Sequence, residues 1–139
     1  MISILLMSHG KMAAGMLDSC KLFFGDDIDH IEAICLEAGD DPEKFDERIN
    51  EASKRLDDGS GVIAFCDLLG GTPSNRSMFC LNDRLHVIAG MNFPMLLEVL
   101  GQRLSTTDVS EIDFATLVDT GKDGIVDLNE KVKEIEGKK

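Results

Sequence analysis

The chain has 139 residues, a length that suits one domain with a proper hydrophobic core and is short for two. Its formal net charge of −12 argues against nucleic acid and anionic membranes as partners, because both require basic patches, and is compatible with a basic protein partner. No run approaches the roughly 18 apolar residues that span a bilayer, and the apolar start lacks the basic flank of a signal peptide.

The first ten residues carry the first functional signal. A short, branched apolar run ends in Ser8-His9-Gly10, and a helical pattern starts directly after it. Such a run predicts a buried parallel strand that delivers His9 to the carboxyl edge of a sheet, where open α/β sheets hold their chemistry. The N–H groups at the start of the following helix are ready to receive an anion. His9 can therefore act as a nucleophile toward phosphorus, and a histidine in a tight turn is the alternative.

Predicted strands and helices alternate through the following hundred residues. Apolar periodicity, glycine and proline positions indicate helices over 12–24 and 42–56, from Pro73, from Asn92, and from Ser110 to just before Gly121, with strands over 28–36, 62–66 and 85–89. Asp113 is expected to complete a loose capping box with Ser110. The alternation predicts one doubly wound α/β domain over residues 1–139, with a mainly parallel sheet in the flavodoxin-like order 2-1-3-4.

The C-terminal residues are expected to add little to that unit. Residues 124–128 could form one short strand, followed from about residue 130 by a charged tail that we expect to be poorly ordered. A strand this short needs a sheet edge, either its own or that of a second copy.

A second stretch, Cys66 to Asn75, is the strongest local signal. Asp67 ends a predicted strand, Gly70 and Gly71 allow backbone N–H groups to approach a ligand closely, Thr72 suits an N-cap, and Pro73 suits the first helical position. The result is an anion-binding nest. It is not a nucleotide P-loop, because the Lys-Ser/Thr pair is absent, and it is not a dinucleotide fingerprint.

The predicted strand order brings both stretches to one place. His9 is then the phosphoryl acceptor, and Asp67 orients the imidazole by accepting one ring N–H. The transferring group needs prearranged donors, which the loop residues supply without a metal or cofactor. The phosphate-binding candidates are Gly10, Gly70, Gly71 and Thr72.

These motifs resemble a known family. The Ser-His-Gly opening, Asp67-x-x-Gly70-Gly71-Thr72-Pro73-x-Asn75, the run from Val87 to Leu96 and the late Thr120-Gly121-x-x-Gly124 are similar to the IIA component of the mannose/fructose/sorbose family of the bacterial phosphoenolpyruvate-dependent sugar phosphotransferase system. The similarity covers nearly the whole chain in order.

The resemblance implies a cytoplasmic phosphocarrier. His9 matches the family histidine that takes a phosphoryl group from the phosphorylated histidine phosphocarrier protein and passes it to a IIB component, which phosphorylates sugar entering through membrane IIC and IID subunits. The motif aspartate matches Asp67, and the loop serine or threonine matches Thr72. Family members are homodimers with an exchanged C-terminal strand, which implies the same here. The chain departs from many members at Leu69, where they carry tryptophan, and at Ser74, where they carry phenylalanine.

Four other functions are compatible with parts of this pattern. A three-histidine metal site is disfavoured because His30 and His86 fall near the amino edge of the sheet, opposite His9. A hydrolase triad of Ser8, His9 and Asp67 fails because adjacent strand residues project to opposite sides. A histidine phosphatase would carry arginine where Ser8 stands. A noncatalytic phosphate-sensing regulatory domain could use the same pocket.

The four cysteines lack a C-x-x-C pair, which favours core residues in a reducing cytosol over a zinc cluster.

Overall fold

The strands form one parallel sheet in the order β2-β1-β3-β4. A computed structural model describes residues 1–137, and the strands are β1 (Ser3–His9), β2 (Ile31–Leu36), β3 (Val62–Cys66) and β4 (Leu85–Ala89). The predicted α/β class and the order 2-1-3-4 are confirmed. With β1 and β3 paired side by side, their two carboxyl ends, and the loops that follow them, meet at the same edge of the sheet.

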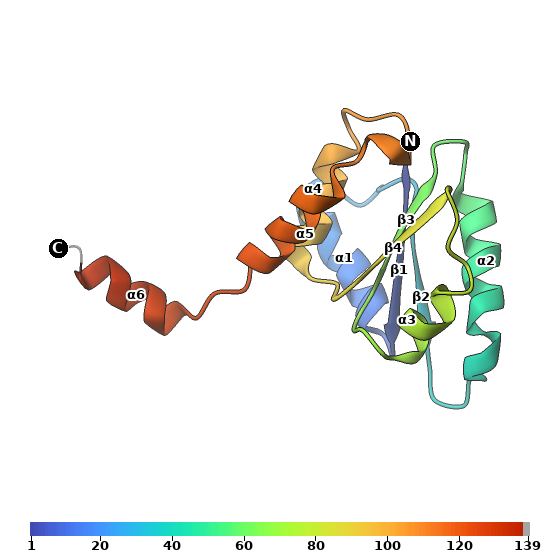
Figure 1. Cartoon of the computed structure of the whole chain (residues 1–139), viewed down its shortest axis with the longest axis horizontal. Helices are drawn as coiled ribbons and strands as arrows, with labels where there is room; N and C mark the ends of the chain where they lie inside the picture. The colour runs from blue at the N-terminus through green and yellow to red at the C-terminus, as the bar shows by residue number, and fades with distance from the viewer. Residues whose placement is uncertain (138–139) are drawn as a thin grey trace.

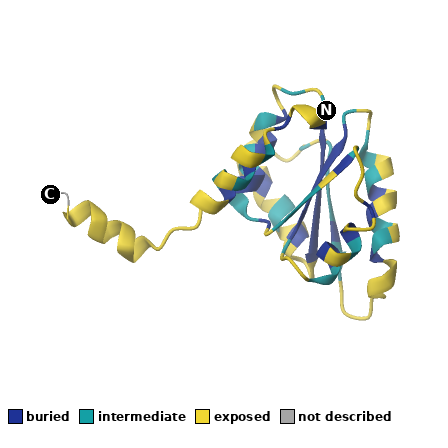
Figure 2. Cartoon of the chain, viewed as in Figure 1, coloured by how far each residue is buried: buried dark blue, intermediate teal, exposed yellow. Residues whose placement is uncertain are grey.

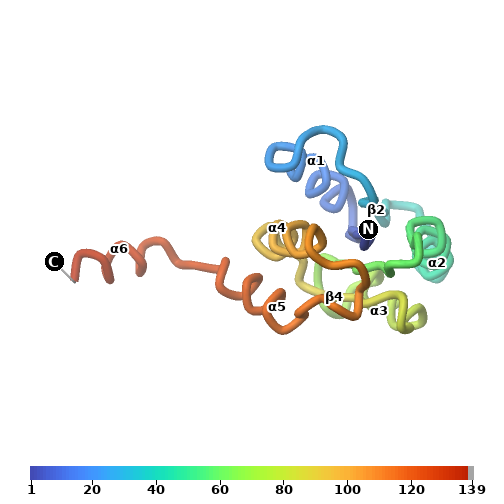
Figure 3. The backbone as a smooth tube through the Cα atoms, turned by 90° about the horizontal axis from the view of Figure 1, so that it is seen from above, coloured from blue at the N-terminus to red at the C-terminus, as the bar shows by residue number. Residues whose placement is uncertain are grey.

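Helices cover both faces of the sheet. The helices are α1 (Met12–Phe24), α2 (Phe45–Leu56), α3 (Thr72–Ser77), α4 (Phe93–Gln102), α5 (Phe114–Asp123) and α6 (Leu128–Gly137), with 3-10 turns at Pro42–Lys44 and Val109–Glu111. Helices α1, α4 and α5 lie on one side of the sheet and α2 and α3 on the other (Figures 1 and 3). Helix α6 extends away from this body.

The central strand β1 explains why its sequence is continuously apolar. Ile4 and Leu6 pack into the core under α1 and α4, whereas Leu5 and Met7 pack into the core under α2. All four side chains are fully buried. A strand covered on both faces has no solvent side, so it needs no polar alternation.

Strand β2 begins later than its apolar pattern predicts, at Ile31 rather than residue 28. His30 has a φ of +55°, a conformation that a strand cannot continue through. The carbonyl oxygen of His30 still accepts a hydrogen bond from the Ile4 N–H at 2.8 Å. The buried Arg103 guanidinium also donates to carbonyl oxygens at this corner, those of Ile2, Asp29 and His30. The turn before β2 is therefore fixed by a residue distant in the sequence.

The start and end of the predicted fifth helix were both wrong. Asp113, not Ser110, is the N-cap of α5, because its carboxylate accepts the Thr116 N–H at 3.0 Å. The 3-10 turn at Val109–Glu111 precedes it. The helix also continues through Gly121 to Asp123, and the Asn92 side chain donates to the Gly121 carbonyl at 3.0 Å.

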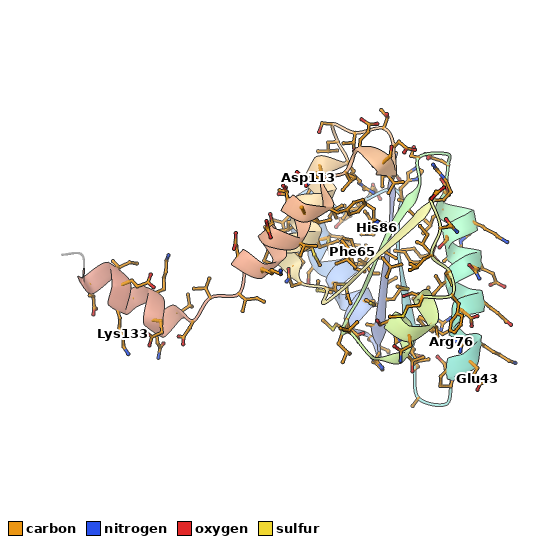
Figure 4. The ribbon with its side chains drawn as sticks, viewed as in Figure 1. Glu43, Phe65, Arg76, His86, Asp113 and Lys133 are labelled. Carbon is orange, nitrogen blue, oxygen red and sulfur yellow. The ribbon has the colours of Figure 1, made fainter. Side chains whose placement is uncertain are left out.

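The C-terminal segment is helical where the sequence predicted a short strand. Residues 125–127 are irregular, and α6 then covers Leu128–Gly137 without one buried residue (Figure 2). Figure 4 shows Lys133 on this helix, far from the sheet. The predicted strand at 124–128 was therefore wrong, and the expected poorly ordered tail is a helix as far as residue 137; its last two residues lie outside the described part. Across residues 1–137, no helix is both long and apolar enough to cross a membrane.

Candidate functional site

The centre of the candidate site is a pair formed by His9 and Asp67. His9 is the last residue of β1, and Asp67 directly follows β3, the strand beside it. The His9 Nδ1 atom lies 2.8 Å from Asp67 Oδ2, and the His9 backbone N–H donates to the same oxygen at 2.8 Å. The Leu68 N–H donates to the other oxygen at 3.0 Å. With Nδ1–H directed at the carboxylate, the lone pair of the ring remains on Nε2.

Exposure differs sharply between the two partners. The side chain of His9 is 45% exposed, whereas that of Asp67 is 6% exposed. Burial by itself raises the pKa of the Asp67 carboxyl, but the hydrogen bonds from the His9 backbone, the His9 ring and the Leu68 N–H outweigh it, so the pKa lies below its ordinary value. Asp67 is thus a fixed carboxylate behind an imidazole that a partner can reach.

Gly71 packs closely against the imidazole. A Cβ atom built on Gly71 would lie 2.5 Å from His9 Cε1 and 3.2 Å from Nε2, so any side chain here would collide with the ring. The neighbouring Gly70 has a φ of +88°, which favours glycine. The sequence predicted that both glycines let the backbone approach a ligand, and in the structure Gly71 also makes room for His9.

The loop offers backbone donors next to the ring. Within residues 1–137, the N–H groups of Gly70, Gly71 and Thr72 donate to no acceptor. Asn75 pulls the loop carbonyls toward α3, because its side chain donates to the Gly70 oxygen at 3.1 Å and its backbone N–H to the Gly71 oxygen at 2.9 Å. The sequence motif contains Asn75, but the motif alone does not reveal this role. A polar residue one turn into the helix was the available signal.

Two expectations about the loops need correction. Gly71 is the N-cap of α3, and Thr72 is its first helical residue, so the predicted N-cap at Thr72 was wrong by one position. The Gly10 N–H donates to the Leu36 carbonyl at 2.7 Å, and this amide is therefore already engaged rather than available to phosphate. Gly10 instead ties the His9 turn to β2.

Ser8 has a structural position. It is fully buried, its Oγ donates to the Gly10 carbonyl at 2.9 Å, and the same Oγ accepts the Ala13 N–H at 2.7 Å. The hydroxyl thus bridges the turn and the first turn of α1. Its hydrogen bonds leave it out of the His9–Asp67 pair, in agreement with the rejection of a hydrolase triad.

The other two histidines lie at the opposite edge, as predicted. His30 directly precedes β2, and its Nδ1 lies 3.2 Å from Ser3 Oγ. His86, near the start of β4, stacks on the Phe114 ring with a centroid separation of 3.5 Å and an angle of 12°. In the described part of the chain no three His, Cys, Asp or Glu side chains gather into a possible metal cluster, and the four cysteines are unpaired.

This fold and this corner define a class of protein. The chain matches the family model described as PTS system fructose IIA component over residues 3–117. It belongs to that family and is an EIIA component of the mannose and fructose type.

Individual relatives agree with that assignment. The chain is 32% identical over 135 residues to the PTS system mannose-specific EIIAB component of Escherichia coli K12, an alignment that covers 96% of this chain but 41% of the relative. It is 30% identical over 105 residues to the PTS system fructose-specific EIIA component of Bacillus subtilis, covering 74% of this chain and 71% of the relative. The crystal structure of the phosphotransferase system component EIIA from Streptococcus agalactiae superposes with a TM-score of 0.82 at 27% identity, covering 94% and 99% of the two chains.

Proposed function

We propose that this chain is a cytoplasmic phosphocarrier whose His9 accepts a phosphoryl group from the phosphorylated histidine phosphocarrier protein and passes it to a IIB component. The observation that carries the proposal is the exposed imidazole whose Nδ1 is held at 2.8 Å by the buried Asp67 carboxylate. This arrangement fixes one ring nitrogen and leaves the other, Nε2, as a nucleophile. Membrane IIC and IID subunits would act downstream of the IIB component.

The transfer needs no other reactant. The Nε2 lone pair of His9 attacks the phosphorus on the donor histidine, a new N–P bond forms, and the donor N–P bond breaks with its electron pair returning to the donor ring. The Nδ1–H stays on His9 and donates to Asp67, which stabilises the phosphorylated ring. The N–H groups of Gly70, Gly71 and Thr72, with the Thr72 hydroxyl, are the donors that we assign to the phosphoryl oxygens. The reverse set of bond changes delivers the group to the IIB component.

The test is incubation with labelled phosphoenolpyruvate, enzyme I and the histidine phosphocarrier protein, with and without a IIB protein. We expect an acid-labile, alkali-stable label on wild-type protein without any nucleotide, and its loss to the IIB protein. His9→Ala should abolish labelling, because it removes the acceptor nitrogen. His30→Ala and His86→Ala, at the opposite edge, should label normally.

Two outcomes would contradict the proposal. Full labelling of His9→Ala would show that another residue is the acceptor. A stable label that no IIB protein removes would favour the phosphate-sensing regulatory alternative, in which the same pocket retains the group.

We also propose that the chain is a homodimer in which the C-terminal segments are exchanged. Helix α6 carries Leu128, Val132 and Ile135 at helical spacing, and the three side chains are 71%, 51% and 52% exposed. Ile125, in the preceding segment, is 78% exposed. An apolar stripe of which more than half is exposed favours a partner surface, and a second copy is the simplest one.

A further inference from the structure

A cavity of about 150 Å³ opens beside the His9 site, between α3 and the outer strand β4. Cys66 and Ser74, both buried, are part of its floor. At its rim stand Leu69, Met78 and Leu81, which are 74%, 58% and 55% exposed. We call these five residues and the space between them the α3–β4 pocket.

The α3–β4 pocket is continuous with the site. Cys66 directly precedes Asp67 in the chain, and Leu69 directly precedes Gly70 in the phosphate loop. Leu68 continues the apolar surface toward the imidazole. A Cβ atom added to Gly71 would meet both side chains, because it would lie 2.5 Å from His9 Cε1 and 3.5 Å from Leu68 Cδ2. The rim of the pocket therefore forms one side of the surface from which His9 is reached.

The polar groups of the floor are engaged with one another. The Ser77 hydroxyl donates to the Ser74 carbonyl at 2.7 Å, and the Cys66 thiol donates to the Ile88 carbonyl at 3.8 Å. Because these groups already have partners, a polar ligand gains little here, whereas an apolar side chain loses water contact without leaving polar atoms unpaired. A volume of about 150 Å³ is enough for a group as large as an aromatic ring.

A protein that reacts with His9 lies over this pocket, whether or not it inserts a side chain there. Direct transfer brings the reacting atoms to about 3 Å, so the partner backbone lies over the imidazole. A specific interface covers about 800 Å² of each partner, which is a disc of roughly 16 Å radius. The α3–β4 pocket begins at the residues next to Asp67 and Gly70, and thus falls inside such a footprint.

We propose that the α3–β4 pocket receives an apolar anchor side chain of the IIB acceptor and sets which acceptor is used. This inference rests on the proposed function. By the family resemblance of the motif, Leu69 and Ser74 stand where many members carry tryptophan and phenylalanine. A phosphocarrier that serves different IIA components must tolerate such replacements, whereas an acceptor matched to one IIA component can exploit them.

The test compares variants of the pocket with a matched surface control. Ser74→Phe fills the floor, and the double variant Met78→Ala/Leu81→Ala removes exposed rim side chains without touching the core. Leu22→Ala/Leu104→Ala removes two apolar side chains that are 88% and 71% exposed and do not line the pocket. The probe is a mannose-family IIB protein that removes label from phosphorylated wild-type protein.

Both pocket variants should raise the KM for the IIB protein by about 10- to 100-fold, with kcat at saturation unchanged, because binding is lost and the chemistry is not. Labelling of His9 by the histidine phosphocarrier protein should change by less than about twofold, as should every rate of the control.

Three outcomes would overturn the inference. An unchanged KM in both pocket variants would show that the pocket is not an anchor site. An equal loss in labelling by the phosphocarrier would show a surface common to both partners. A change from dimer to monomer in light scattering would show that a second copy of this chain occupies the pocket. If wild-type protein takes no label at all, the proposed function fails instead, so the two failures are distinguishable.

Discussion

The His9 corner and the segment 125–137 differ in what determines their structure. At the corner, three N–H groups converge on the Asp67 carboxylate, and Gly71 lies against the imidazole. In the C-terminal segment α6 has no buried residue, and Ile125 is 78% exposed. A short sequence pattern specifies one structure where the chain's own contacts complete it. Where those contacts are missing, the same few apolar residues are compatible with a strand or a helix.

The largest loss of activity at the His9 corner is expected from adding one carbon atom at Gly71. In Gly71→Ala the new methyl group would lie 2.5 Å from His9 Cε1, so the ring or the loop must move. Misplacing a nucleophile by about 1 Å can cost roughly 100-fold in rate, and we expect a loss of that size in His9 labelling by the phosphocarrier.

Gly101→Ala in α4 is the matched control for Gly71→Ala. Nothing lies within 4 Å of a Cβ at Gly101, and alanine favours a helix interior more than glycine does. The control should label normally and unfold at the same or a higher temperature. Normal labelling of Gly71→Ala would show that the close packing against the ring is dispensable.

Removing the orienting carboxylate should have the next largest effect. Asp67→Ala leaves both the ring and the backbone N–H of His9 without their acceptor. We expect labelling to slow by about 10- to 100-fold, the penalty typical for loss of a group that orients a functional histidine. Far-UV circular dichroism should be unchanged, since Asp67 lies at the sheet edge. Unchanged labelling rates would show that another group orients the ring.

The same carboxylate should give the corner a pH-dependent stability. The pKa of Asp67 is lower in the folded chain than its ordinary value, so its contribution to stability is fully present above the unfolded pKa of about 4 and is lost as the pH falls through the folded pKa. Wild-type protein and Asp67→Asn share all other carboxylates. The difference between their free energies of unfolding, measured in urea, should shrink as the pH falls below about 4. If this difference in the free energy of unfolding stays the same below about pH 4, the hydrogen bonds of the Asp67 carboxylate do not contribute to stability as argued.

Sequence reasoning found the corner because its signals are local and the topology is restricted. The continuous apolar run that ends at His9 favours a strand buried on both faces, and the glycines before Pro73 mark a loop that opens a helix. The order 2-1-3-4 then brings both together. The contact of Gly71 with the imidazole was missed, because no pattern in either stretch encodes the distance between them.

The errors occur where the deciding contact is distant or absent. Strand β2 starts at Ile31 because His30 turns the chain under Arg103, the C-cap residue of α4. Asp113 caps α5 although Ser110 is also a good N-cap residue, and sequence alone ranks two such residues poorly. The start of β2 is thus set by a tertiary contact, whereas the two N-cap candidates of α5 lie too close together for the sequence to separate them.

Removing the C-terminal segment should have the smallest effect on the chemistry. Truncation after Gly124 keeps Gly121, whose carbonyl is bonded by Asn92, and removes only residues from 125 onward. Because α6 has no buried residue, the shortened chain should fold, and His9 should label within about twofold of the wild-type rate. The oligomeric state should change instead: light scattering should give a dimer for the full chain and a monomer or aggregate for the truncated one.

The triple variant Leu128→Ser/Val132→Ser/Ile135→Ser, which keeps the full length but loses the apolar stripe, should also be monomeric. If the full-length protein is already a monomer at micromolar concentration, the exchange of C-terminal segments has to be dropped, and the exposed stripe of α6 needs another partner.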